Sequence, residues 1–243
     1  MTLTPDIEGR IAAVCIGRVG ELVARGRAHT TAFVKSPVDG PVPLGTLGLA
    51  GDEHAYHDHG GVDQALLIYS IDNYPFWRRE LDLDLPVAGA MAENVTVEGL
   101  TEREVFIGDT FDVDGVLVQV TSPRGPCFKL GVRYGERRMA RVMQDSCRTG
   151  YLMRVLAEGH LVAGQTMRLV DRPANSMTVA EAARVANRDR DDWPVVERLA
   201  RIPSLADAMR IQLEARLERR DRGDDEARLY GEGEGRPTHS ARS

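Results

Sequence analysis

Cys127 has the surroundings in this sequence that most favour chemistry. It lies in the run TSPRGPCFKL, residues 121–130, directly after Pro126. The proline restricts the backbone, while the guanidinium of Arg124 and the ammonium of Lys129 favour the thiolate over the thiol. Such a thiolate serves as a nucleophile or as a ligand of a soft metal. The alternative is a free cysteine that fills a small apolar gap, and the local sequence leaves both interpretations open.

Residues 51–65, GDEHAYHDHGGVDQA, hold three of the six histidines. His54, His57 and His59 are of the type that binds zinc, which raises the hypothesis of a zinc hydrolase. Spacings of three and two residues, however, fit neither one face of a helix nor one face of a strand. A zinc site is therefore the weaker interpretation of this cluster.

A single catalytic imidazole at His59 is the more economical interpretation, with His54 and His57 as solvated loop residues. Gly60 and Gly61 follow it and allow backbone to approach a ligand closely. An imidazole titrates near neutrality, so His59 is a candidate proton donor, and Asp63 is its candidate orienting partner.

Lysine is rare in this chain. Lys35 and Lys129 are the two lysines among 31 basic side chains, and Lys129 lies two residues beyond Cys127. Chance is one explanation. The other is that both positions need a compact point charge, as a phosphate or a polarised ligand oxygen would demand.

Asn94 stands at the entrance of an expected strand. An asparagine there commonly caps a turn. Its amide also carries a donor and an acceptor together, which suits recognition of a polar heterocycle.

Composition excludes several classes of protein. The chain has 243 residues, of which 42% are hydrophobic, and a formal net charge of -6, which argues against a nucleic-acid binder. Three cysteines and an N-terminus without an apolar run indicate no disulfide framework and no secretory signal, so we expect a cytoplasmic location. Nothing approaches the roughly 20 apolar residues of a membrane span.

Short strands and few helices are expected up to residue 172. Many short strands separated by glycine, proline and aspartate predict a barrel or a sandwich, and Val113-Asp114-Gly115 predicts a hairpin. The predicted strands are Ile11–Ile16, Thr31–Val34, Ala65–Tyr69, Asn94–Val97, Val105–Ile107, Val116–Thr121, Leu152–Leu156 and Gln165–Val170, with helices at Asp72–Leu81 and Glu136–Gln144.

The periodicity becomes helical after residue 172. A capping box at Thr178–Glu181 opens the first of three expected helices, which occupy residues 173–220. A stabilising cap on the preceding domain is the favoured interpretation, and partner docking is the alternative. Residues 221–243 are rich in Gly, Arg, Asp and Glu, which predicts a disordered tail.

Several motifs in this order resemble a MOSC domain of the YiiM type, with the three-alpha domain that follows it in such proteins. They are KSPVDGP (35–41), GDE (51–53), HGGVD (59–63), EN (93–94), IGD (107–109) and PRGPCFKL (123–130). The resemblance implies a mainly β fold, with a β-barrel of the pyruvate-kinase type in residues 1–172 (core about 30–171) and a small three-helix domain in residues 173–220.

The resemblance also implies a molybdenum cofactor. The cysteine that matches Cys127 would be the protein thiolate on molybdenum, consistent with the soft-ligand preference of thiolate. Lys35 and Ser36 would meet the phosphate or the pterin. The residues expected near them are Arg124, Lys129, Asn94, His59, Gly60 and Gly61.

The activity expected from this resemblance is reduction of N-hydroxylated compounds, such as 6-hydroxylaminopurine, which detoxifies them. Because the chain carries no flavin or iron–sulfur motif, a separate reductase would supply electrons to a monomer or homodimer. The alternative is a non-catalytic carrier of the cofactor or of a persulfide. Pyridoxal phosphate, nucleic acid and membrane are not expected as partners.

Overall fold

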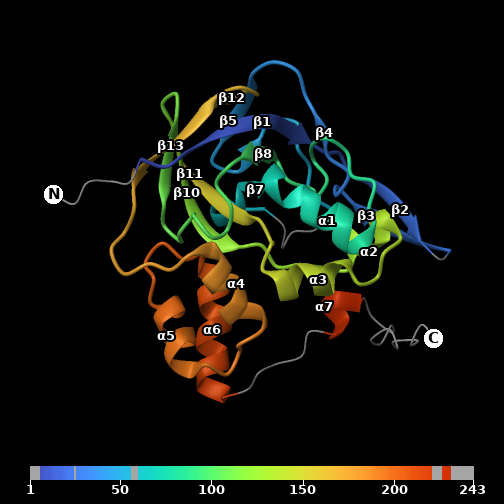
Figure 1. The fold of residues 1–243 in the computed structure, drawn as a ribbon. Helices are drawn as coiled ribbons and strands as arrows, with labels where there is room; N and C mark the ends of the chain where they lie inside the picture. The colour runs from blue at the N-terminus through green and yellow to red at the C-terminus, as the bar shows by residue number, and fades with distance from the viewer. Residues whose placement is uncertain (1–5, 25, 56–59, 221–225, 231–243) are drawn as a thin grey trace.

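A closed β-barrel forms the larger part of the molecule (Figure 1). The computed structural model describes residues 6–24, 26–55, 60–220 and 226–230. In that part of the chain, the sheet order β13-β9-β10-β11-β7-β8-β1 is closed by pairing of β13 with β1. Neighbouring barrel strands are antiparallel except β7 and β8, which are parallel. The expected mainly β barrel is confirmed.

The elements are bounded as follows. The strands are β1 Glu8–Ile16, β2 Gly20–Ala24, β3 Arg27–Thr31, β4 Ser36–Pro37, β5 Val42–Gly45, β6 Gly48–Leu49, β7 Leu66–Ser70, β8 Val95–Glu98, β9 Thr110–Val113, β10 Val116–Pro123, β11 Tyr151–Ala157, β12 Gly159–Leu161 and β13 Thr166–Asp171. The helices are α1 Tyr74–Leu81, α2 Lys129–Tyr134, α3 Met139–Ser146, α4 Val179–Asn187, α5 Trp193–Ala200, α6 Asp207–Arg219 and α7 Glu226–Tyr230, with 3-10 turns at Val62–Gln64 and Ile71–Asn73.

Period-two burial builds the barrel wall. On β10, Val116, Val118 and Val120 are buried while the residues between them are partly exposed. The expected hairpin joins β9 to β10, and Asp114 and Gly115 both have positive φ, 51° and 92°. This is the geometry that a two-residue hairpin turn requires.

Two of the predicted strands are wrong. The strand that we expected at residues 31–34 ends at Thr31, whose hydroxyl oxygen accepts a hydrogen bond from the Phe33 N–H at 3.2 Å and turns the chain. Residues 105–107 form an isolated bridge between Phe106 and Thr178 in place of a strand. The bridge brings the start of α4 to the barrel.

The three-helix unit shares its core with the barrel. Helices α4, α5 and α6 lie together at one end of the barrel (Figure 1). The predicted capping box at Thr178 is present, with the hydroxyl bonded to the Glu181 N–H and the Glu181 carboxylate bonded back. Val179, Leu199 and Leu213 are buried in the same cluster as the barrel valines. Such a shared core is typical of a stabilising cap.

Asp63 connects the barrel to the three-helix unit. One carboxylate oxygen accepts from the Arg154 guanidinium, at 3.0 Å from Nε and 2.8 Å from Nη2. The other accepts from the backbone N–H of Asp207 at 3.0 Å, in the first turn of α6. An anion at a helix N-terminus satisfies an otherwise unpaired amide and complements the helix dipole.

The C-terminal tail that we predicted for residues 221–243 is wrong in one segment. Residues 226–230 form α7, in which Leu229 and Tyr230 are 2% and 7% exposed against Ala140. These two apolar residues interrupt the charged composition and bury enough surface to order a short helix. The other residues of this range lie outside the described residues.

No helix in the described ranges is both long and apolar enough to cross a lipid bilayer.

We predict that Asp63→Ala lowers the free energy of unfolding by about 1–2 kcal/mol, because it removes an ion pair and a helix-capping acceptor together. Urea unfolding followed by circular dichroism measures this. Asp39→Ala, at an exposed aspartate, is the matched control and should be neutral. Unchanged stability of Asp63→Ala would contradict the connecting role.

Candidate functional site

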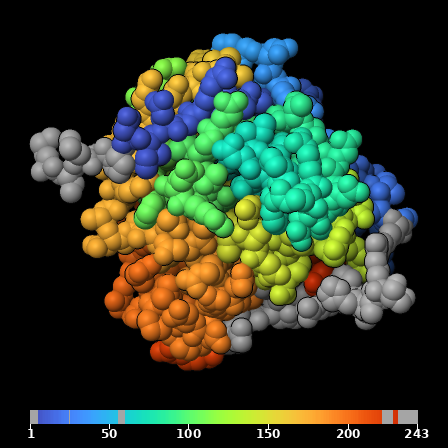
Figure 2. All heavy atoms as spheres, in the orientation of Figure 1, coloured from blue at the N-terminus to red at the C-terminus, as the bar shows by residue number. Residues whose placement is uncertain are grey.

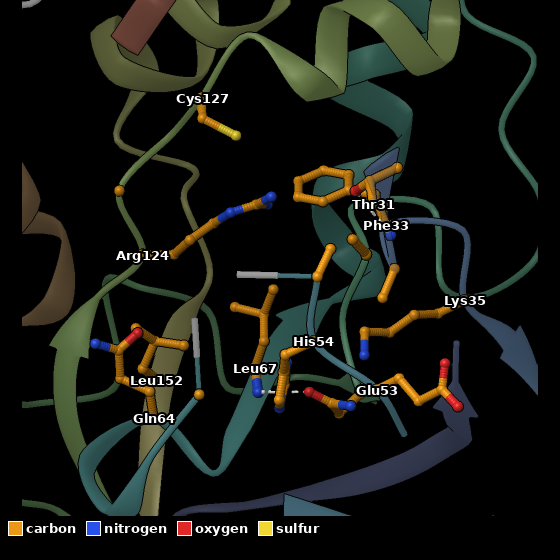
Figure 3. Close-up of a pocket in the computed structure, with 16 residues that line it drawn as sticks. Thr31, Phe33, Lys35, Glu53, His54, Gln64, Leu67, Arg124, Cys127 and Leu152 are labelled. Carbon is orange, nitrogen blue, oxygen red and sulfur yellow. Dashed lines mark hydrogen bonds between the residues drawn. The ribbon is translucent and has the colours of Figure 1, made fainter. Parts of the chain in front are cut away.

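A cavity of about 180 Å³ opens between the end of β3, the loop after Asp52 and the Cys127 loop (Figure 3). It brings together predicted site residues from four distant segments. Its lining comprises Thr31, Ala32, Phe33, Lys35, Glu53, His54, Ala55, Gly60, Gln64, Leu67, Ala92, Asn94, Arg124, Gly125, Cys127 and Leu152.

Cys127 lies on the loop between β10 and α2 and is half-buried. Figure 3 shows its Sγ directed to the same space as the Arg124 guanidinium and the Phe33 ring. This arrangement presents a thiol beside a cation and an aromatic face. An anionic ligand could bind here with its charge on the Arg124 guanidinium and one of its atoms bonded to Cys127 Sγ.

Arg124 is held in place by the chain itself. It is 6% exposed, its Nη1 donates to the Met91 carbonyl at 2.8 Å, and its guanidinium lies 5.1 Å from the centre of the Phe33 ring. Burial lowers the pKa of Arg124, and the nearby Cys127 opposes that shift. An arginine remains a cation even so, which places a fixed positive charge near the thiol.

Lys35 forms a buried ion pair with Asp52. The ammonium donates to both carboxylate oxygens, and the two side chains are 7% and 3% exposed. Burial lowers the pKa of Lys35, and the charge of Asp52 opposes that shift. Lys35 therefore lines the cavity while its charge is neutralised by Asp52.

Asn94 positions the carboxylate of this pair. Its Nδ2 donates to Asp52 Oδ2 at 2.9 Å, and its Oδ1 accepts from the Leu67 N–H at 3.1 Å, the dashed line in Figure 3. The Gly17 N–H donates to the other oxygen of Asp52 at 2.8 Å. Asn94 therefore bonds to protein groups on both sides of its amide, and its recognition of a heterocycle stays a prediction.

His54 is an exposed loop residue, as expected, and it also lines the cavity. Its ring packs on Gly60, where a Cβ would stand 2.8 Å from the imidazole. Gly60 also has a φ of 88°. Glycine is needed here for both reasons, and its close approach to His54 was not visible in the spacing.

His57 and His59 lie outside the described residues, so the expected proton donor and its pairing with Asp63 stay predictions. Asp63 itself does not line the cavity. Among the described residues, no three His, Cys, Asp or Glu side chains form a group that could hold a metal ion. The zinc hypothesis depends on His57 and His59, which are not among the described residues.

Three further predicted residues also lie away from the cavity lining. Ser36 is exposed in β4, where it pairs with Ile16. Gly61 is exposed before the 3-10 turn, with a φ of 94°. Lys129 is 7% exposed at the start of α2. Their roles toward a cofactor stay predictions.

The sequence reasoning missed Phe33, Thr31, Gln64 and Glu53 as lining residues. For Phe33 a signal existed, since an aromatic residue precedes the rare Lys35 by two positions. The others have no local pattern that distinguishes them from ordinary loop residues.

A second cavity, of about 680 Å³, lies where α3 and α4 meet the barrel. Its thiol is Cys147, whose pKa is raised by burial. Its charged lining is balanced between Arg103, Arg148, Arg184 and Arg188 and the acids Asp72, Glu102, Asp145 and Glu181. It lacks the motif residues of the first cavity, which we take as the candidate site.

Comparison with known proteins places these observations in a family. A model of the MOSC domain matches residues 55–168. Protein YiiM of Escherichia coli strain K12 is 39% identical over 170 residues, which span 69% of this chain and 75% of YiiM. YflK, an uncharacterized protein of Bacillus subtilis strain 168, is 33% identical over 213 residues, 87% of this chain and 95% of YflK.

A protein named reductase, from Gibberella moniliformis, is 38% identical over 180 residues, but the chain spans only 32% of its length. The crystal structure of YiiM from Escherichia coli superimposes with a TM-score of 0.73 at 29% identity, covering 91% of this chain and 99% of that one. YiiM from Geobacillus stearothermophilus also gives a TM-score of 0.73, at 28% identity over 86% of this chain and 99% of that one.

We predict that Lys35→Met lowers the free energy of unfolding by roughly 3–5 kcal/mol, because it leaves the Asp52 carboxylate buried without its cation. Adding Asp52→Asn should recover part of that loss, so the two changes are not additive. Urea unfolding of both single variants and the double variant measures the coupling.

The matched control is Arg141→Met, which breaks an ion pair to Asp145 whose side chains are 43% and 46% exposed. It should cost about 0.5 kcal/mol or less. Additive effects of the Lys35 and Asp52 changes would contradict a coupled buried pair.

Proposed function

Because the chain belongs to the MOSC domain family, with YiiM as a relative over most of its length, we propose that it is a molybdenum cofactor-dependent reductase of N-hydroxylated compounds such as 6-hydroxylaminopurine. MOSC domains are associated with molybdenum cofactor binding. The single observation that carries the proposal is the position of the Cys127 thiol, beside Arg124 at the wall of a cavity.

The residues present fit such a cofactor by the chemistry of their donor atoms. Cys127 offers a soft sulfur ligand, which suits a metal bound by thiolates. Arg124 offers a cation for an anionic phosphate or dithiolene, Lys35 lines the same cavity as one half of an ion pair with Asp52, and Gly60 lets backbone approach closely. The cofactor, when bound, supplies the two-electron redox chemistry that these side chains lack.

The reaction we propose breaks the N–O bond of the substrate. Two electrons and two protons convert an N-hydroxylated amine to the amine and water. Cys127 binds the cofactor, and the cavity beside it is where the substrate binds. The electrons come from a separate reductase, which makes that protein a proposed partner.

A histidine of residues 54–59 donates a proton to the departing oxygen. Imidazole titrates near neutral pH and so can hold and release a proton under working conditions. His59 is the donor expected from the sequence. His54 is a second candidate, since it lines the cavity.

We predict that Cys127→Ala, reconstituted with the cofactor, retains less than about a tenth of the wild-type molybdenum and loses at least 100-fold in turnover of 6-hydroxylaminopurine, because the sulfur ligand is removed. Metal analysis and an assay with an artificial electron donor measure both. Cys147→Ala, which changes a half-buried thiol away from this cavity, is the control. Wild-type activity of Cys127→Ala would contradict the proposal.

The same preparations distinguish the carrier function. A carrier would exchange cofactor with an apo-acceptor at a rate that depends on Cys127, and the wild-type protein would show no turnover. Stoichiometric zinc in place of molybdenum would contradict both functions and favour a hydrolase.

We predict that removing the proton donor lowers kcat by about 100-fold while molybdenum content stays normal. His59→Ala and His54→Ala, assayed side by side from pH 5 to pH 9, identify which imidazole is responsible. His160→Ala, at an exposed histidine of β12, is the control. Full turnover in both histidine variants would contradict proton donation by this segment.

A further inference from the structure

The short helix α7 lies beside α3 and beside the loop that carries Cys127. Figure 1 shows it, in red, next to α3, and in Figure 2 its atoms lie among the yellow-green atoms of α3 and its neighbours. Its residues follow Cys127 by about 100 positions in the chain. A segment from the far end of the sequence thus contacts the loop that carries the candidate metal ligand.

Arg228 contacts the chain on both sides of Cys127. Its guanidinium donates to the carbonyl of Pro126, the residue before the cysteine. Its own carbonyl accepts from the N–H of Phe128, the residue after it, at 2.9 Å. One residue therefore fixes both peptide groups that flank the cysteine, which limits rotation of the loop and of the thiol.

The same guanidinium connects the loop to two helices. It donates to the Gln144 side chain of α3 at 2.5 Å and reaches the Asn187 side chain of α4 at 3.5 Å. Gln144 is 4% exposed. A planar guanidinium presents several donors in fixed directions, so arginine can serve all three acceptors where lysine cannot.

Apolar packing holds α7 against the molecule. Leu229 and Tyr230 are 2% and 7% exposed in a cluster with Ala140 of α3. Burying these two side chains offsets the entropy of ordering a helix this short. The hydrogen bonds of Arg228 are thereby kept at the Cys127 loop.

We propose that α7 is a strap over the Cys127 loop and that Arg228 is a positioning residue for the cysteine. Arg228 orients the loop so that the thiol meets the cavity in one conformation. Its effect on cofactor retention rests on the proposed function, but its effect on the loop does not. Cys127 can therefore be examined in protein that holds no cofactor.

The test is the rate at which iodoacetamide alkylates Cys127 in the full-length, cofactor-free protein, resolved by peptide mass spectrometry. We expect Arg228→Ala to raise this rate about tenfold, the effect of losing one or two hydrogen bonds. The alkylation rate of Arg228→Lys should lie between those of wild type and Arg228→Ala, because lysine can keep some but not all of the three hydrogen bonds of the guanidinium. Leu229→Asp, which keeps the arginine in the sequence but removes the packing that holds α7 on the molecule, should match Arg228→Ala.

Arg198→Ala, at an exposed arginine of α5, is the matched control and should leave the rate unchanged. Alkylation of the fully buried Cys15 reports global unfolding and should stay slow in every variant. An unchanged Cys127 rate in both Arg228→Ala and Leu229→Asp would overturn the proposal. So would a parallel rise at Cys15, because the effect would then be loss of the fold and not release of a loop.

A second readout connects the strap to the cofactor. Reconstituted Arg228→Ala should lose molybdenum on dialysis faster than wild type, and Arg228→Lys should lose it at an intermediate rate. Suppose that Arg228→Ala is alkylated faster but the wild-type protein binds no molybdenum. That result would support the strap and contradict only the proposed function.

Discussion

The candidate site depends on the buried ion pair between Lys35 and Asp52. Asn94 and the Gly17 amide hold the carboxylate, and the carboxylate holds the lysine. Each participant comes from a different part of the barrel, so the pair joins β1, β8 and the loop that leads to His54. Because neither charge is exposed enough to be stabilised by water, loss of one partner would leave the other uncompensated.

The barrel was predictable because its local patterns agree with its global order. Alternating burial on β10, the hairpin at Asp114-Gly115 and the capping box at Thr178 each depend on residues close together in sequence. The error at residues 31–34 has the opposite origin. The side chains there have strand propensity, but the Thr31 hydroxyl bonds the backbone two residues on and turns the chain toward the cavity.

Part of the lining of the cavity was predictable from the sequence, and the contacts that hold it in place were not. Cys127, Arg124, Lys35 and Asn94 were identified by residue type and do meet at one cavity. The bonds of Asp63 to Arg154 and to the start of α6 were not visible, because both partners lie more than 90 positions away. Contacts over such distances have no signature in local spacing, and the strap of α7 was missed for the same physical reason.

The central claim is that Cys127 supplies the protein sulfur to a molybdenum centre. X-ray absorption at the molybdenum edge of the reconstituted protein tests it most directly, by comparing wild type with Cys127→Ser. The account predicts one sulfur neighbour fewer around the metal in the variant, with the remaining sulfur distances unchanged. An identical sulfur shell in both proteins would contradict it.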